Sequence, residues 1–164
     1  MNINDSIAKF FNTPFVRGRE FRTFKDLNIA SAGVYTIRIV VPVNTILTGL
    51  ELVLTGGNVS LETISGGTAG GTYAETLPRI NTNTMQGTPA YTPLVVMTAG
   101  GTVTGGTVID VVRVKADTNS NRATAVGSTT ADQRGVGPGT YFWRLTNATG
   151  DPAVGTFKTR WQEV

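Results

Sequence analysis

GVYTIRIVV, which spans Gly33–Val41, is the stretch that first indicates the fold, because its side chains alternate between two faces. One face carries Tyr35, Ile37, Ile39 and Val41, and the other carries Val34, Thr36, Arg38 and Val40. An apolar face opposite a mixed face, at a period of two residues, predicts a half-buried strand. Pro42 then ends this strand, because proline has no N–H to donate to a neighbouring strand.

The next alternating stretch is GLELVLTGGNVSLETIS, residues 49–65. Its apolar side chains fall at every second position on both sides of Gly56-Gly57-Asn58. These three residues tolerate the positive φ angles that a tight turn needs. We therefore expect two strands joined as a β-hairpin.

Four later stretches also have the character of strands. Residues 91–101 contain a short apolar strand that ends at Gly100, and residues 107–116 (TVIDVVRVKA) are rich in Val on both faces, which predicts a central strand. Residues 140–147 (TYFWRLTN) and 156–164 (TFKTRWQEV) carry Tyr141, Trp143, Phe157 and Trp161 at alternate positions. If these two strands pair, the four aromatic side chains form one cluster in the core.

At least seven strand signals are separated by glycine-rich turns, and no segment has a strong helical pattern. The sequence therefore predicts an all-β fold, with a β-sandwich or jelly-roll-like body or a small β-barrel.

Gly-Gly-Thr occurs four times, in SGGTAGGTY (residues 65–73) and in TAGGTVTGGTV (residues 98–108). A phosphate-binding loop places such glycines between a strand and the start of a helix. Here a strand pattern follows Gly106, and Pro78 interrupts the segment that follows Gly71. We expect these glycines at strand ends and turns, and the match between the two copies is too short to establish an internal duplication.

The chain of 164 residues has no Cys and no His. This composition excludes disulfides, thiolate nucleophiles and Cys-ligated zinc, and it removes the most common general base and metal ligand. Residues 117–128 (DTNSNRATAVGS) begin like a calcium-binding loop, but Arg122 and Ser128 stand where that loop needs Gly and Glu. No motif selects the two carboxylates that a glycosidase needs. We therefore expect no catalytic, cofactor-binding or metal site. We also expect that this protein is not an enzyme.

Asp110 stands out because it lies inside the Val-rich stretch of residues 107–116. A buried or half-buried carboxylate needs a partner for its charge. A salt bridge with Arg113, Arg144 or Arg38 is therefore favoured over a catalytic role.

The charge of the chain is uneven. Residues 1–25 carry five basic and two acidic side chains, so the whole formal net charge of +3 lies there, while residues 26–164 carry nine of each sign. We therefore divide the chain into a basic, aromatic and extended N-terminal arm (1–25) and an all-β body (26–164). A basic segment on a neutral body suggests docking onto an acidic surface.

No apolar run is long enough to span a membrane, no secretion signal begins the chain, and the neutral body does not indicate nucleic-acid binding.

Four phrases resemble a family of small virion proteins of tailed bacteriophages. They are FKDLNIASAGVYTIRIVVPV, GGTYAETLPRI, GGTVTGGTVIDVVRVKA and RGVGPGTYFWRLTN, and the resemblance extends over roughly residues 14–164. No catalytic motif anchors it, and no defined binding residue carries over from it. The family is that of capsid auxiliary proteins, which decorate or cement the phage head.

The resemblance implies a compact β protein without active site or cofactor, a homo-oligomer and most often a trimer, made in the host cytoplasm. It would bind the major capsid protein on the exterior of the virion and bridge capsomers. Together with the charge asymmetry, it suggests that the arm docks on the capsid through Phe10, Phe11, Phe15, Arg17, Arg19, Phe21, Arg22, Phe24 and Lys25. Deleting residues 1–25 should then abolish capsid binding and leave a folded body.

Two other functions remain open at this stage. One is a neck, tail or fibre component that contacts host glycans, which an exposed aromatic patch near Tyr73, Tyr91 or Trp161 would favour. The other is a carboxylate-based glycan hydrolase, which would need two carboxylates close together in a groove.

Overall fold

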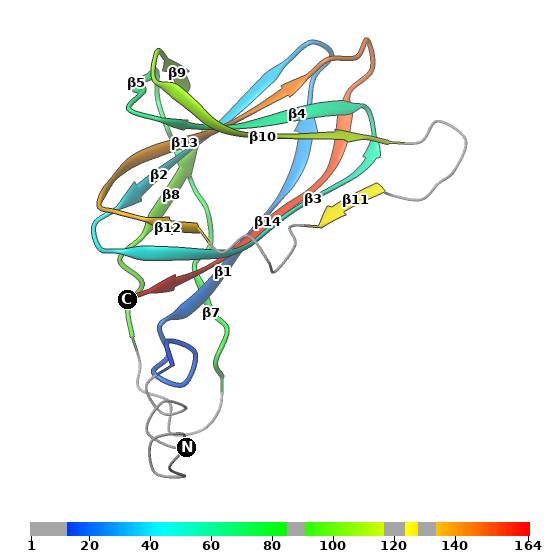
Figure 1. The fold of residues 1–164 in the computed structure, drawn as a ribbon. Coiled ribbons are helices and arrows are strands. Elements are labelled where there is room, and N and C mark those ends of the chain that lie inside the picture. Colours follow the sequence, from blue (N-terminus) through cyan, green and yellow to red (C-terminus); the bar gives the residue numbers. More distant parts are fainter. Residues whose placement is uncertain (1–12, 85–90, 117–123, 128–133) are drawn as a thin grey trace.

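The structure of the chain is a computed structural model that describes residues 13–84, 91–116, 124–127 and 134–164. Within these residues every regular element is a β-strand and none is a helix, which confirms the predicted all-β fold. Two sheets pack face to face, and a two-stranded ribbon lies outside one of them (Figure 1). All strand pairs are antiparallel.

Sheet A has six strands and contains both the first and the last strand of the body. In spatial order these are β11 (Thr124–Gly127), β3 (Thr45–Gly56), β14 (Ala153–Glu163), β1 (Glu20–Ile29) and β7 (Ile80–Asn81), with β12 (Arg134–Val136) also paired to β3.

Sheet B also has six strands. In spatial order they are β10 (Thr107–Lys115), β4 (Asn58–Ser65), β13 (Gly139–Asn147), β2 (Val34–Val41), β8 (Val96–Ala99) and β6 (Glu75–Thr76). The ribbon consists of β5 (Thr68–Gly70) and β9 (Thr102–Thr104).

Eight of these strands have the topology of a jelly roll. Sheet A contains the order β1-β14-β3-β11 and sheet B the order β2-β13-β4-β10. Along the chain these strands alternate between the two sheets, except that β4 and β10 follow each other within sheet B. This is the arrangement that forms when a long antiparallel hairpin rolls up into two facing sheets. Of the all-β folds that the sequence predicted, the chain therefore adopts the jelly-roll-like sandwich.

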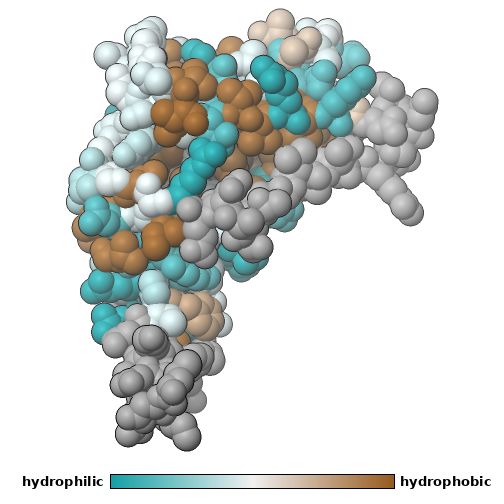
Figure 2. All heavy atoms as spheres, viewed as in Figure 1, coloured by the Kyte–Doolittle hydropathy of each residue, from teal (hydrophilic) through white to brown (hydrophobic). Residues whose placement is uncertain are grey.

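The core between the sheets follows the alternation in the sequence. Ile37, Ile39 and Val41 of β2 are at most 4% exposed, as the period of two predicted. Leu52 and Leu54 of β3 are at most 1% exposed and meet them from the other sheet. Figure 2 shows hydrophobic residues gathered across the middle of one side of the molecule.

The predicted hairpin at residues 49–65 is wrong, because β3 and β4 belong to different sheets. Gly57 has a φ of +82°, as the turn chemistry required, but the turn carries the chain from sheet A to sheet B. A Cβ on Gly57 would come within 2.6 Å of Ala153, so the corner packs directly on the start of β14. The glycine permits this close approach as well as the positive φ.

The condition for the four-residue aromatic cluster is not met, because β13 and β14 lie in opposite sheets and do not pair. Trp143 and Phe157 instead meet across the sandwich, with ring centroids 5.2 Å apart. Both are at most 1% exposed, which confirms that they pack in the core.

The predicted central position of residues 107–116 is also wrong. Among the described strands β10 is an edge strand that pairs only with β4, and it leaves Val108, Ile109 and Val111 between 40% and 47% exposed. A β-bulge between Val108 and Asp110 interrupts its register with β4. The Val residues on both faces of β10 therefore do not mean that both faces of this strand are buried.

The Gly-Gly-Thr copies pair with each other. β5 lies in the first copy and β9 in the second, and they form the antiparallel ribbon. Positive φ angles occur at Gly66, Gly71, Gly100, Gly105 and Gly106, which confirms that the glycines serve strand ends and turns. The ribbon places Val103 over Ile64 and Phe142, and this makes a second, smaller core outside sheet B.

The last residues of the chain are fixed by a buried carboxylate. Glu163 is 1% exposed, and its Oε1 accepts hydrogen bonds from the backbone N–H of Leu94 and Val95, both at 2.9 Å. The indole N–H of Trp161 donates to the same oxygen at 3.2 Å. These donors satisfy the charge and join the end of β14 to the segment before β8.

The predicted boundary between arm and body, at residues 25 and 26, falls inside β1. Residues 20–29 form one strand that lies between β14 and β7, so residues 20–25 are part of the body. The preceding residues 13–19 form a turn, whose Gly18 carbonyl accepts a hydrogen bond from the Asn81 side chain at 2.6 Å. Deleting residues 1–25 would therefore remove six of the ten residues of β1, so we no longer expect this deletion to leave a folded body.

Candidate docking surface

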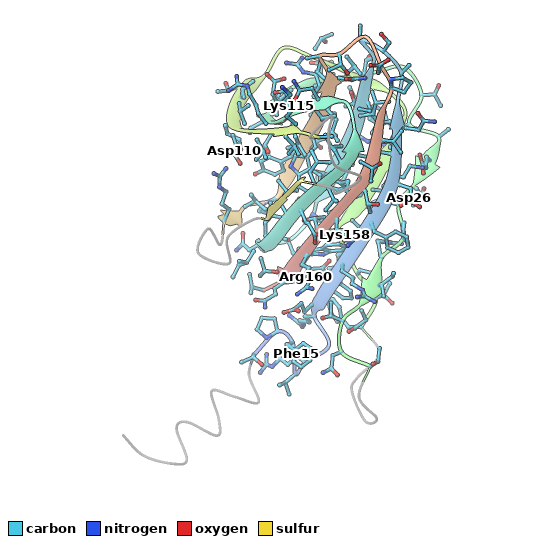
Figure 3. All side chains as sticks on the ribbon, turned by 90° about the vertical axis from the view of Figure 1, so that its right-hand side faces the viewer. Phe15, Asp26, Asp110, Lys115, Lys158 and Arg160 are labelled. Carbon is cyan, nitrogen blue, oxygen red and sulfur yellow. The ribbon has the colours of Figure 1, made fainter. Side chains whose placement is uncertain are left out.

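The outer face of sheet A brings basic and aromatic side chains from β1 and β14 together. In the register of these strands, Arg22 lies opposite Arg160 and Phe24 lies opposite Lys158. All four side chains are exposed, and we call them the basic face. Figure 3 shows Lys158 and Arg160 along β14, with Asp26 farther along β1.

The two arginines of the basic face have no carboxylate partner in the part of the chain that the structure describes. Lys158 lies 3.6 Å from Glu51, but neither Arg22 nor Arg160 forms a salt bridge with any residue that the structure describes. Like charges directly opposite each other on antiparallel strands are destabilising. The pair therefore costs stability in the isolated protein and offers two guanidinium groups to an anionic partner.

Exposed aromatic rings flank these charges. Phe24 is 45% exposed on the strand itself, and Phe15 is 37% exposed in the turn that precedes β1. The turn is held to the body because the side-chain amide of Asn83 donates to the carbonyl of Phe15 at 2.8 Å. Aromatic and Arg side chains are the types most enriched at the centres of protein interfaces.

The residues predicted to dock have different positions in the structure. Phe10 and Phe11 lie outside the described residues. The exposed ones are Phe15, Arg17, Arg22 and Phe24. Of these, Arg22 and Phe24 share the outer face of β1, while Phe15 and Arg17 lie in the turn at its start.

Three of the predicted docking residues contact other parts of the protein, so we remove them from the docking surface. Phe21 is 0% exposed and belongs to the core between the sheets. The guanidinium of Arg19 lies 4.7 Å from the centre of the Tyr91 ring, in a cation–π contact. Lys25 forms a salt bridge with Glu75 at 2.5 Å. For Phe21 and Lys25 the reason is the alternation of β1, which turns every second residue of the strand toward the interior, whereas Arg19 precedes the strand.

Arg160 and Lys158 were missed by the sequence reasoning. A signal was present in the sequence, because both residues alternate with Phe157 and Trp161, which were expected in the core. Their charge lies 130 residues or more from that of Arg22 in the sequence, so a search for a basic segment could not combine them.

Lys25 and Glu75 belong to a small polar cluster that also includes Tyr35. The Tyr35 hydroxyl donates a hydrogen bond to Glu75 Oε2 at 2.9 Å. Burial raises the pKa of the Tyr35 hydroxyl far above its ordinary value, and its hydrogen bond to Glu75 raises it further. The hydrogen bond from Lys25 lowers the pKa of Glu75, with a smaller contribution from Tyr35. The cluster keeps an ion pair and a neutral tyrosine at neutral pH.

Asp110 has a salt-bridge partner, but a different one from those predicted. It pairs with Arg134 of β12 at 3.2 Å, across the gap between the sheets. Arg144 pairs with Glu62 at 2.7 Å, and the guanidinium of Arg38 lies 4.8 Å from the centre of the Tyr73 ring. Asp110 therefore forms a salt bridge, as expected. Its partner is Arg134 rather than Arg113, Arg144 or Arg38.

Among the described residues no three acidic side chains lie close enough to hold a metal ion. The calcium-like stretch of residues 117–128 falls mainly outside the described residues. The part of the chain described by the structure has no helix that could cross a membrane. No protein-family model, no curated protein and no solved structure matches this chain.

Proposed function

We propose that this chain is a non-enzymatic decoration protein of a bacteriophage capsid, which binds the outer surface of the head and bridges capsomers. The observation that carries the proposal is that Arg22 and Arg160 lie opposite each other on the outer face of sheet A and form no salt bridge with any described residue. Charges that are left unpaired at a cost in stability are best explained by a partner that supplies the opposite charge. The partner would be a carboxylate-rich surface of the major capsid protein.

The fold supports this proposal at the level of architecture. The jelly roll is common among capsid and lectin domains, although a fold alone does not define a function. The resemblance of the sequence to capsid auxiliary proteins points in the same direction. Many identical copies on one shell would bind with avidity, so a modest docking surface on each copy suffices.

The alternative, a neck, tail or fibre component that contacts glycans, is less well supported. It called for an exposed aromatic patch near Tyr73, Tyr91 or Trp161. Trp161 is fully buried, and Tyr91 lies beneath Arg19 and beside Phe21. Tyr73 packs on Phe142 and donates its hydroxyl proton to the carbonyl of Thr102 at 2.6 Å.

The copy number of this protein in purified particles tests the proposal. In particles from cells that produce the protein, quantitative mass spectrometry should give a ratio to the major capsid protein near one, or a simple fraction set by the lattice. A few copies per particle would move the protein to the neck, tail or fibres. Absence from particles would overturn the structural role.

A second experiment tests the docking surface. Particles that lack the protein are incubated with purified protein, and binding is measured by co-sedimentation. The double variant Arg22→Gln, Arg160→Gln should bind at least about 10-fold more weakly and with less dependence on salt. The control Arg113→Gln, Lys115→Gln removes the same charge from β10 and should bind like the wild type. Equal loss in both variants would show a net-charge effect and would remove the basic face from the proposal.

A further inference from the structure

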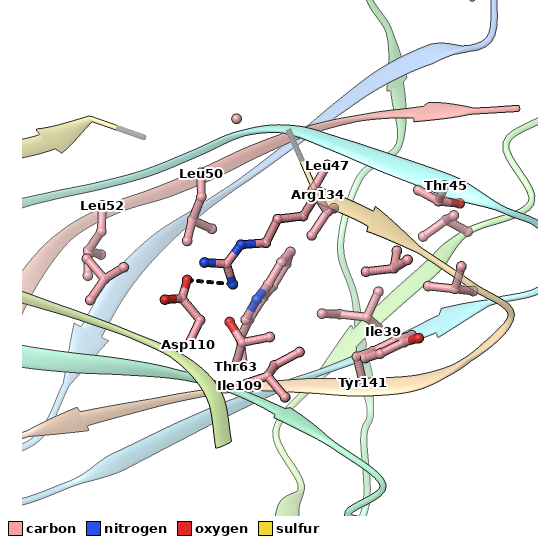
Figure 4. A pocket seen from close by; sticks show the side chains of 16 residues that line it. Ile39, Thr45, Leu47, Leu50, Leu52, Thr63, Ile109, Asp110, Arg134 and Tyr141 are labelled. Atoms are coloured by element: carbon pink, nitrogen blue, oxygen red, sulfur yellow. Dashed lines mark ion pairs between the residues drawn. The ribbon is translucent and has the colours of Figure 1, made fainter. Parts of the chain in front are cut away.

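A cavity of about 220 Å³ lies between the two sheets, on the side where their edge strands do not meet. β10 ends sheet B here, and β12 lies beside β3 in sheet A. The two strands do not pair, so the described parts of the two sheets leave an opening between them. Figure 4 shows side chains from both sheets converging on this space.

The backbone explains why the core leaves this space unfilled. The register of β3 shifts at Thr48, and that of β10 shifts at Ile109, so both strands that border the cavity are irregular. Gly49, next to the first irregularity, lines the cavity without a side chain. Protein interiors normally contain few voids larger than a water molecule. A cavity of this size is therefore a local feature of these two strands rather than ordinary packing.

The chemistry of the walls is mainly apolar. Leu47, Leu50, Val112 and Trp143 are among the lining residues, together with other aliphatic side chains. The wall has few polar side chains, and most of them already have partners. Among the described residues, the buried side-chain oxygens without a partner belong to Thr23 and Thr48, and neither residue lines the cavity.

The charges at the opening compensate each other. Asp110 and Arg134 form their salt bridge across the cavity, with side chains 29% and 44% exposed (Figure 4). The Tyr141 hydroxyl donates to the carbonyl of Gly137 at 3.1 Å, and that of Thr45 donates to Val43 at 3.0 Å. An anionic or cationic ligand would therefore find no free counter-charge among the described residues that line the cavity, and a neutral ligand would disturb no existing pair.

We propose that this cavity is a binding site for a neutral, largely apolar small molecule, of the size of one aromatic ring with a short alkyl chain. A dry apolar cavity of about 150 Å³ is large enough to bind benzene. The volume here is larger by about the space that a short alkyl group needs. Binding would restore the contacts that the lining residues lack when the cavity is empty.

The two tryptophans of the chain make the test specific. Trp143 lines the cavity, whereas Trp161 does not and donates its indole N–H to Glu163. The full-length protein is titrated with ethylbenzene, and both indole N–H resonances are followed by NMR. The Trp143 resonance should shift and saturate with a Kd below about 1 mM, while the Trp161 resonance stays in place. No shift, or a linear shift of both resonances, would overturn the proposal.

Substitutions at two neighbouring residues of β10 give a variant whose cavity is filled and a matched control variant. Val112 lines the cavity, and Val111 points to the other side of the strand and is 40% exposed. Val112→Phe should weaken ethylbenzene binding at least about 10-fold, because the ring occupies the site. Val111→Phe should bind ethylbenzene like the wild type. If Val112→Phe does not fold, Leu50→Phe fills the cavity from sheet A, and unchanged binding by a folded filled variant would contradict the site.

The class of ligand is tested with a charged analogue of similar size. Benzoate should bind at least about 10-fold more weakly than ethylbenzene, because Arg134 is already paired with Asp110. Benzoate that binds as tightly as ethylbenzene would show that the salt bridge opens for an anion. That result would overturn the assignment of a neutral ligand.

Discussion

The outer faces of the two sheets differ, although both sheets have six strands. Sheet B is covered on part of its outer face by the β5–β9 ribbon, which buries Ile64 and Phe142. The ion pair between Glu62 and Arg144 neutralises charges on the same sheet. On sheet A, the described residues provide no such cover, and Arg22 and Arg160 face each other without a counter-charge.

The cause of this difference lies in the strands themselves. β4 and β13 carry apolar residues on both faces at Ile64 and Phe142, so both faces need a packing partner. β1 and β14 alternate regularly, with polar or exposed residues on every outward position. An antiparallel sheet of the second kind is stable with one face in water. One face is therefore completed by the chain itself, while the other remains available to a partner.

Two phenylalanines provide the strongest test of this difference. Phe142 lies beneath the ribbon and is 0% exposed, and Phe24 on sheet A is 45% exposed. Phe142→Ala should lower the free energy of unfolding by about 3–5 kcal/mol. Phe24→Ala should change it by about 0.5 kcal/mol or less. Denaturant unfolding of both variants measures the effects, and similar losses would mean that the two faces are packed alike.

Two adjacent glycines test whether the ribbon packs closely on sheet B. Gly105 and Gly106 both have positive φ, so Ala costs about 1–2 kcal/mol at either position. A Cβ on Gly106 would also lie 2.7 Å from the backbone nitrogen of Gly67, whereas none of the described atoms lies within 4 Å of one on Gly105. Gly106→Ala should therefore be less stable than Gly105→Ala by about 1–3 kcal/mol in thermal or denaturant unfolding. Equal losses would show that only the φ angle matters.

The arginine pair should show opposite effects on stability and on binding. Arg160→Gln removes a like charge opposite Arg22, so the free energy of unfolding should rise by a few tenths of a kcal/mol. The same change should weaken binding to particles. Unfolding at low salt, where the repulsion is least screened, gives the most sensitive measurement. A loss of stability would indicate that Arg160 has a favourable partner in the isolated protein.

The polar cluster around Glu75 predicts a small dependence on pH. Because Lys25 and Tyr35 lower the pKa of Glu75, its contribution to stability is present above the ordinary pKa of 4.5. That contribution is lost as the pH falls through the lower pKa of the folded state. The thermal midpoint of Glu75→Gln should therefore fall less than that of the wild type between pH 7 and pH 3. An equal fall in both proteins would remove Glu75 from the acid sensitivity.

Sequence patterns showed which residues face inward, but they could not show which strands pair with each other. Ile37 and Leu52 were predicted to be inward from the period of two, and the aromatic side chains of β13 and β14 were predicted to be core residues. The same pattern predicted a hairpin at residues 49–65 and a central strand at 107–116, and both predictions were wrong. Alternation specifies which face a side chain occupies, but an edge strand and a central strand can alternate in the same way.

The candidate site shows the same division more sharply. Arg22 and Phe24 were selected from the sequence because they lie in a basic and aromatic segment, and the structure places them on an exposed face. Phe21 and Lys25 were selected by the same reasoning, but they face inward. Arg160 was not selected, because nothing local in the sequence connects it with Arg22.

The sequence by itself determined that this protein is all-β, where strands such as β2, β3, β4 and β13 fall, and that its glycine repeats serve turns. These properties depend on side-chain alternation and on backbone freedom, which act over a few residues. Only the tertiary structure decided that β1 pairs with β14, that β3 and β4 lie in opposite sheets, and that Arg22 meets Arg160. Pairing between strands at the two ends of the chain depends on how the whole hairpin rolls up to bury its apolar faces, and no local pattern records that closure.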